Sequence, residues 1–136
     1  MVGVLLVTHQ DFGHKLLQTA EGILGEQQGC LAVSVNVQHN MEDILQDIKA
    51  GIQEVDRGQG VLVLTDMFGG SPSNLSLSLL GSGRLEVITG ANLPMLLKIL
   101  GSRDLKLQDL ALQAKSAGQQ GIVVAGEVLK QKVTDG

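Results

Sequence analysis

The sequence predicts an α/β fold, a three-layer sandwich with a mainly parallel four-stranded sheet. Three observations support this prediction. Strand and helix patterns alternate from end to end. Residues 2–7 are almost purely apolar, as expected for a central strand buried on both faces. Strands joined by helical crossovers pair in parallel through right-handed connections. The length of 136 residues predicts a single domain over residues 1–136.

The first half of the chain predicts two strands, each followed by a helix. After the strand at residues 2–7, a helix is expected with Asp11 as N-cap and Gly25 as its end. Its apolar face comprises Phe12, Leu16, Leu17, Ala20, Ile23 and Leu24. Residues 30–37 alternate in polarity, with Leu31, Val33, Val35 and Val37 on one face, which indicates a half-exposed strand near a sheet edge. The next helix carries the apolar stripe Met41, Ile44, Leu45, Ile48, Ile52 and Val55.

The third and fourth strands are expected at residues 60–65 and 85–89. A helix follows the third strand, with Ser71 as its N-cap and Pro72 in its first turn, and it is expected to run to Gly81.

Two more helices follow the fourth strand. The first is capped by Asn92 and carries Pro94 in its first turn. The second covers residues 107–117 and is ended by Gly118. Residues 122–125 form either a short last strand or the start of a terminal helix, because periodicity does not decide between these alternatives.

Composition excludes several classes of protein. A formal net charge of −4 without a Lys/Arg cluster lacks the footprint of nucleic-acid binding. Two Phe and no Trp or Tyr leave little for bases or sugars to stack on. Cys30 stands alone, so an intramolecular disulfide is impossible. No apolar run approaches the ~18 residues of a membrane span, so we expect no membrane insertion and a cytoplasmic protein.

His9 is the first candidate for chemistry, because it follows the buried first strand directly. Ligands of open α/β sheets bind beyond the carboxyl ends of the strands. An imidazole nitrogen can attack phosphorus and hold a phosphoryl group when an acceptor fixes the other ring nitrogen. Asp66, at the end of the third strand, is the expected acceptor. The alternative is a strand-end histidine that only hydrogen-bonds a loop, and the presence of Asp66 favours function.

The glycine-rich turn after Asp66 is the second candidate. Gly69 and Gly70 let backbone N–H groups approach an anion, and a helix beginning at Ser71 directs its positive dipole end to the same place. This turn lacks the Gly-Lys-Ser/Thr ending of a P-loop. The alternative is a tight turn that needs glycine only for its geometry.

The remaining polar residues give weaker predictions. Asn92 either caps its helix, the favoured interpretation, or lines the same crevice as His9. His39 is expected on the surface. No metal or other cofactor is predicted, because Asp11 and His14 begin a helix that does not bring them to His9. A receiver domain is also excluded, since its acidic pair is missing after the first strand.

Three motifs together resemble the enzyme IIA domain of the mannose family of the bacterial phosphoenolpyruvate:sugar phosphotransferase system. They are Leu-Val-Thr-His at residues 6–9, Asp-Met-Phe-Gly-Gly-Ser-Pro-Ser-Asn at residues 66–74, and Gly-Ala-Asn-Leu-Pro-Met-Leu at residues 90–96. The resemblance covers nearly the whole chain in order and spacing. It implies that His9 accepts a phosphoryl group from the phosphocarrier protein HPr and passes it to an enzyme IIB, with Asp66 as carboxylate partner.

The resemblance also implies a homodimer in which a C-terminal edge strand is exchanged, with residues 122–125 as the candidate. The chain departs from the family pattern at Gln10, Phe68 and Ser73, which flank the site and are expected to alter partner choice. We expect Gln10, Phe68, Pro72 and Asn92 at the interface with partners. The alternative function is a regulatory phosphorelay protein whose phosphorylation state is read by another protein, without sugar transport.

Overall fold

The computed structural model describes residues 1–36, 38–81 and 84–135. Four parallel strands form one sheet in the order β2-β1-β3-β4. They are β1 (Gly3–His9), β2 (Cys30–Val35), β3 (Val61–Thr65) and β4 (Leu85–Thr89). The predicted α/β class and parallel sheet are therefore confirmed, with β2 at one edge as expected. Val37, predicted to end the second strand, lies outside the described residues.

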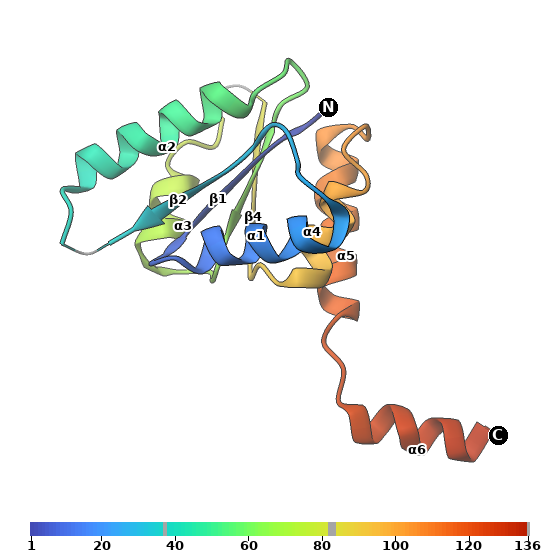
Figure 1. Cartoon of the computed structure of the whole chain (residues 1–136). Helices are drawn as coiled ribbons and strands as arrows, with labels where there is room; N and C mark the ends of the chain where they lie inside the picture. Colours follow the sequence, from blue (N-terminus) through green and yellow to red (C-terminus); the bar gives the residue numbers. More distant parts are fainter. Residues whose placement is uncertain (37, 82–83, 136) are drawn as a thin grey trace.

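Helices cover both faces of the sheet and make the other two layers (Figure 1). One face carries α1 (Phe12–Leu24), α4 (Leu93–Leu100) and α5 (Leu107–Gln120). The other carries α2 (Met41–Val55) and α3 (Gly70–Leu77). The last helix, α6 (Ala125–Asp135), stands apart from the layers at the end of an irregular segment (Figure 1).

The two cores follow from the alternation of side chains along the central strands. Val4 and Leu6 of β1 face the first set of helices, whereas Leu5 and Val7 face the second. All four side chains are fully buried, as the apolar run in the sequence predicts. Burial of one such side chain contributes about 1.5–3 kcal/mol to the stability of the fold. The central strands therefore stabilise the sheet from which the site residues extend.

Three residues of the predicted apolar face of α1 are not in the core. Leu16, Leu17 and Ala20 pack inward as predicted. Phe12, Ile23 and Leu24 are 46%, 58% and 46% exposed. These three lie at the two ends of the helix: Phe12 is its first residue, and Ile23 and Leu24 are its last two.

Gly118 packs inside a helix, contrary to the prediction that it ends one. Helix α5 continues to Gln120, and Gly118 is buried against α4. A Cβ at this position would meet the Met95 side chain at 2.9 Å. A glycine that permits close helix packing and a glycine that ends a helix look alike in sequence, which explains the error.

The segment between α5 and α6 belongs to no strand of the described sheet. Residues 122–124 are irregular, and α6 begins at Ala125. The sheet of the described residues is thus entirely parallel, and the possible antiparallel edge strand is not formed within a single chain. Ile122, Val123 and Val124 are 76%, 57% and 62% exposed, which leaves an apolar segment uncovered.

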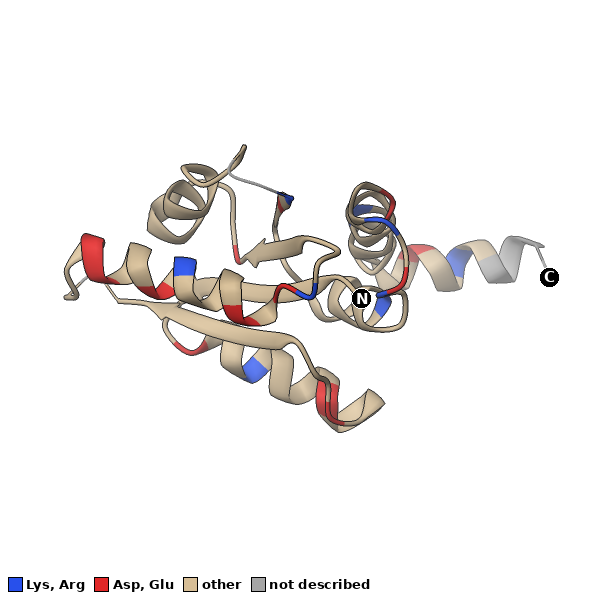
Figure 2. Cartoon of the chain, turned by 90° about the horizontal axis from the view of Figure 1, so that it is seen from above, with Lys and Arg blue, Asp and Glu red and all other residues tan. Residues whose placement is uncertain are grey.

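Charged residues of both signs are interspersed along the helices and loops in Figure 2. This agrees with the absence of a basic cluster in the sequence. In the described part of the chain, no helix has both the length and the apolar character needed to cross a membrane.

Arg103, between α4 and α5, ties three segments together at the amino ends of the strands. Its Nε and Nη2 donate to the Val2 carbonyl at 2.9 and 2.8 Å, Nη2 also donates to Gly29 at 3.0 Å, and Nη1 donates to Gln28. The side chain is buried, and that burial lowers the pKa of its guanidinium. Sequence patterns did not single it out, because its partners are all backbone carbonyls.

Arg103→Ala is expected to lower the free energy of unfolding by roughly 2–4 kcal/mol, because it leaves buried carbonyl groups without donors. Urea denaturation measures the change. Arg103→Lys should fall between wild type and Arg103→Ala, because a point charge replaces the planar fork of donors. Lys98→Ala, at an exposed position of α4, is the control and should change little. Equal stability of Arg103→Ala and wild type would show that the carbonyl groups find water instead.

Candidate active site

His9 and Asp66 meet at the carboxyl end of the sheet because their strands are neighbours. Strands β1 and β3 pair in parallel, with Val7 opposite Thr65. His9 ends β1, and Asp66 directly follows β3. Parallel strands in this register bring the side chains that follow them to the same edge, as the sequence predicts.

The two side chains are joined by a short contact. His9 Nδ1 lies 2.7 Å from Asp66 Oδ2, and the backbone N–H of His9 donates to the same oxygen at 3.0 Å. The other oxygen, Oδ1, accepts from the N–H of Met67 at 3.1 Å. An ionised Asp66 only accepts, so the Nδ1–H group of a neutral imidazole donates to its Oδ2. The Nε2 lone pair is then free, and the ring is 40% exposed.

Asp66 is held in its charged form by these bonds. Burial alone would raise the pKa of its carboxyl group, but the hydrogen bonds from the ring and backbone of His9 act in the opposite direction. The net effect is a pKa below the ordinary value of 3.8. Asp66 is consequently an acceptor, and not a proton donor, over the whole neutral range.

The chain leaves β1 through an unusual turn. Thr8 is fully buried, and its Oγ1 accepts from the N–H of Gly13 at 2.7 Å. Thr8 thus caps α1, whereas Asp11, at the predicted N-cap position, makes no side-chain cap bond. Gln10 has φ +50°, the one positive φ among the described non-glycine residues. Strained backbone of this kind is concentrated at functional sites, and no sequence pattern revealed it.

Gly70 lies against the imidazole ring of His9. A Cβ built at Gly70 would be 3.2 Å from His9 Cε1 and 3.4 Å from Nε2, and its φ is +82°. Helix α3 begins at Gly70 with Gly69 at the N-cap position, two residues before the predicted N-cap Ser71. Ser71 is therefore inside the helix and does not cap it. No side chain caps α3, so its first N–H groups have no side-chain acceptor, and the free Nε2 faces the start of this helix.

Two residues of the turn are buried beneath the site. Pro72 and Ser73 both lie in the first turn of α3 and are buried, Ser73 completely. Pro72 is buried within the single chain, and its contact with a partner protein stays a prediction. The hydroxyl of Ser73 is the one buried side-chain polar atom without a hydrogen-bond partner in the described part of the chain, at a cost of about 1–3 kcal/mol.

Asn92 is a capping residue with both polar atoms in use. Its Oδ1 accepts from the N–H of Met95 at 3.0 Å, and its Nδ2 donates to the Gly118 carbonyl at 3.0 Å. The favoured capping interpretation is confirmed. The predicted role of Asn92 at a partner interface would require these bonds to break. Gln10 and Phe68 are exposed, as an interface requires, with Phe68 at 76%.

The other two histidines are on the surface. His14 is exposed on α1, and His39 is exposed just before α2. Within residues 1–36, 38–81 and 84–135, no group of three or more His, Cys, Asp or Glu side chains is arranged to hold a metal ion.

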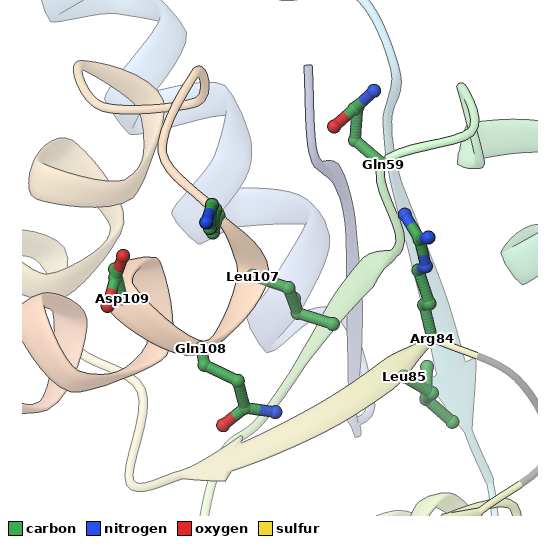
Figure 3. A pocket seen from close by; sticks show the side chains of 7 residues that line it. Gln59, Arg84, Leu85, Leu107, Gln108 and Asp109 are labelled. Atoms are coloured by element: carbon green, nitrogen blue, oxygen red, sulfur yellow. The ribbon is translucent and has the colours of Figure 1, made fainter.

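A cavity of about 600 Å³ lies at the opposite end of the sheet, where β4 begins (Figure 3). It is lined by Gln59, Arg84, Leu85 and residues 106–109 at the start of α5. None of the predicted site residues contributes to it. Ligands of this fold class bind at the carboxyl ends of the strands, and this cavity lies at the other end.

The site thus has a histidine that a carboxylate orients, and the free ring nitrogen lies at an uncapped helix N-terminus. Proteins of the class with such a site can carry a phosphoryl group. Comparison with known proteins agrees. Residues 3–114 match the family described as PTS system fructose IIA component, and the chain belongs to this family. It is therefore a phosphoryl carrier of a sugar phosphotransferase system, in which enzyme IIA components pass phosphate through a histidine.

Relatives and solved structures support the same assignment. The chain is 30% identical to the PTS system fructose-specific EIIA component of Bacillus subtilis, over 98% of this chain and 93% of the relative. It is 33% identical to the mannose-specific EIIAB component of Escherichia coli over 89% of this chain, but spans only 38% of that longer protein. A phosphotransferase system component EIIA from Streptococcus agalactiae superimposes with a TM-score of 0.84 at 26% identity, over 93% of this chain and 99% of that one.

Proposed function

We propose that His9 is the residue that carries the phosphoryl group during sugar uptake. It accepts this group from HPr and passes it to an enzyme IIB, and both transfers take place in the cytoplasm. The observation that carries this proposal is the 2.7 Å contact between His9 Nδ1 and Asp66 Oδ2. That contact leaves Nε2 beside Gly70 and the start of α3. Relatives named as sugar-specific components favour transport over a purely regulatory role.

The proposed reaction moves a phosphoryl group between two imidazole rings. The Nε2 lone pair of His9 attacks phosphorus and forms an N–P bond. The N–P bond of the donor histidine breaks, and the electron pair of that bond returns to the donor ring. The His9 ring becomes cationic, and Asp66 stabilises this charge across the Nδ1–H bond. Transfer to enzyme IIB is the same step in reverse, so one geometry serves both.

We propose that Gly69, Gly70 and Ser71 bind the phosphoryl oxygens through backbone N–H groups. No side chain caps this helix start, and the positive end of the α3 dipole favours an anion there. The glycines have φ +94° and +82°, a conformation that other residues rarely adopt. With no Lys or Arg among residues 66–72, these dipoles are the available source of positive potential.

Gly70→Ala is expected to slow transfer through His9 by about tenfold or more. The added methyl group would stand 3.4 Å from Nε2, in the space that the phosphoryl group needs, and φ +82° strains it further. Quenched-flow transfer from phosphorylated HPr measures the rate. Gly58→Ala is the control, because Gly58 has φ +88° but no neighbour that a Cβ would meet. Equal rates in Gly70→Ala and wild type would leave the turn with a purely geometric role.

The proposal as a whole is tested by incubation with phosphoenolpyruvate, enzyme I and HPr, followed by intact-mass measurement. Wild type should gain the mass of one phosphoryl group, labile in acid and stable in base, as a phosphohistidine is. Addition of the cognate enzyme IIB should remove it. A protein that gains no phosphoryl group under these conditions would contradict the proposed function.

We also propose that the chain forms a homodimer through residues 122–124. Strand β4 is an edge strand, and its outer side borders a groove of about 390 Å³ between β4 and α5. Ile122 lines this groove from the end of α5 and is 76% exposed. An apolar segment next to an unpaired strand edge favours pairing with a second copy, which would satisfy the backbone groups of both.

Sedimentation at micromolar concentration is expected to show a dimer for the intact chain. Truncation after Gly118 should give a monomer or an aggregate. Val123→Pro should weaken the dimer, because proline has no backbone N–H to donate to a strand of the second copy. Residue 123 is irregular within one chain. Ile23→Ala, which trims an exposed side chain of α1, should remain dimeric. An intact chain that sediments as a monomer would contradict strand exchange.

A further inference from the structure

The cavity at the amino end of β4 is formed by residues that the candidate active site does not use. Its volume of about 600 Å³ is typical of cavities that bind small molecules. Gln59 and Arg84 line one side, and residues 106–109 at the start of α5 line the other (Figure 3). His9 lies at the carboxyl end of the sheet, so a ligand in this cavity would occupy a separate site.

The wall of this cavity is partly apolar and is fixed by the sheet. Leu85 begins β4, and only 9% of its surface is exposed. Leu107 packs on Gly60, because a Cβ built at Gly60 would be 3.0 Å from Leu107 Cδ2. The Arg84 carbonyl accepts from the N–H of Val61 at 3.0 Å, which ties the wall to β3. The backbone around the cavity is therefore in place before any ligand binds.

Two positively charged side chains line this cavity without a carboxylate partner. Arg84 and Lys106 are exposed, and neither forms an ion pair with any of the described residues. Arg84 Nη1 makes one long contact, of 3.5 Å, to the Gly58 carbonyl. Lys106 is at the N-cap position of α5 and makes no side-chain cap bond. An anion in the cavity would therefore meet two cations and the positive end of a helix dipole.

The other polar residues of the cavity narrow the class of ligand. Gln59 and Gln108 offer amide groups, and Gln108 Nε2 donates to Glu86 Oε2 at 3.4 Å. Asp109 is the one carboxylate among the described lining residues, and it lies across the cavity from Arg84 (Figure 3). Hard metal ions need several oxygen ligands, and no aromatic side chain is present among the described lining residues to stack on a nucleobase. The lining therefore favours a small anion that carries hydroxyl groups.

We propose that this cavity binds a small phosphate monoester of a polyhydroxylated molecule, the class to which sugar phosphates belong. Arg84 and Lys106 hold the phosphate oxygens, because a phosphate monoester carries about −1.5 to −2 charge at pH 7 and matches two cations. The amides of Gln59 and Gln108 bond to hydroxyl groups, and Leu107 contacts the carbon skeleton. Both cations are exposed, which limits the affinity to a Kd on the order of 1 mM.

A residue-resolved NMR titration of the intact protein tests this site. Glucose 6-phosphate is the probe, glucose tests the hydroxyl groups alone, and inorganic phosphate tests the anion alone. Glucose 6-phosphate should shift the amide signals of residues 84–85 and 106–109 with a lower Kd than inorganic phosphate, and glucose should leave them unchanged. Phosphate bound at the start of α3 would instead shift residues 69–71, so the two sites are observed separately.

Substitutions in the lining should change the affinity with opposite signs. Arg84→Ala and Lys106→Ala should each weaken the binding of glucose 6-phosphate by about fivefold to tenfold, because each removes one cation. Asp109→Asn should strengthen it by roughly twofold, because it removes a carboxylate that repels the phosphate. Lys49→Ala is the control: it removes an exposed cation of α2 that does not line this cavity, and it should bind as wild type does.

The outcomes separate this site from the function of His9. The three lining variants should accept a phosphoryl group from phosphorylated HPr at the wild-type rate, because none of the three residues belongs to the candidate active site. Equal Kd values in wild type, Arg84→Ala and Lys106→Ala would overturn the proposal and leave the function of His9 intact. Shifts confined to residues 69–71 would overturn it as well. A Kd for inorganic phosphate equal to that for glucose 6-phosphate would refute the polyhydroxylated class of ligand.

Discussion

His9→Ala is expected to accept no phosphoryl group from phosphorylated HPr. Removal of the ring removes the Nε2 lone pair, and among the described residues neither of the other two histidines has a hydrogen bond to a carboxylate. The fold should persist, because the ring is 40% exposed and contributes little to either core. Intact-mass measurement after incubation with the phosphorelay mixture reports the result directly, and circular dichroism confirms folding.

The other two histidines provide matched controls. His14→Ala and His39→Ala remove exposed imidazole rings that lie on α1 and before α2. Both variants should gain one phosphoryl group at the wild-type rate. A phosphoryl group that persists in His9→Ala, or disappears in His14→Ala, would move the carrier residue away from His9. The same experiment therefore tests the assignment of the residue separately from the function of the protein.

The fold and the central pair of the site were predictable because they depend on strong, local patterns. Continuous apolar runs at β1 and β3 indicate buried parallel strands, and parallel strands end at the same edge of a sheet. Polar residues directly after both runs therefore had to meet. The contact between His9 and Asp66 follows from that topology, and the structure confirms that the two side chains lie together.

What the sequence did not predict depends on packing and on backbone conformation. Whether Phe12 is buried is decided by where the sheet ends, which periodicity along α1 does not contain. The first turn of α1 is capped by Thr8 Oγ1 and not by the Asp11 side chain, because the buried Thr8 lies beside the N–H of Gly13. The residue type does not indicate the φ of +50° at Gln10, since glycine or asparagine would be expected at a positive φ. All three features lie next to the site, where local rules are most often overridden.

Asp66→Asn is expected to fold and to slow phosphoryl transfer in both directions by roughly 10²-fold or more. If the amide oxygen takes the position of Oδ2, it still accepts from His9, but the negative charge that stabilises a phosphorylated ring is lost. If the amide nitrogen takes that position, it donates toward Nδ1, and the ring proton moves to Nε2 and blocks the attacking atom. Rates toward His9 and toward enzyme IIB measure the loss, and ¹⁵N NMR of the ring reports the tautomer.

The pH dependence of stability supplies a second measurement for the same substitution. The pKa of Asp66 is lowered in the folded protein, so its contribution is present above the ordinary value of 3.8 and is lost as the pH falls through the lower folded value. Wild type should therefore exceed Asp66→Asn in free energy of unfolding at neutral pH, and the difference should shrink in acid. A difference that stays constant across this range, or transfer rates equal to wild type, would show that the carboxylate does not act on His9.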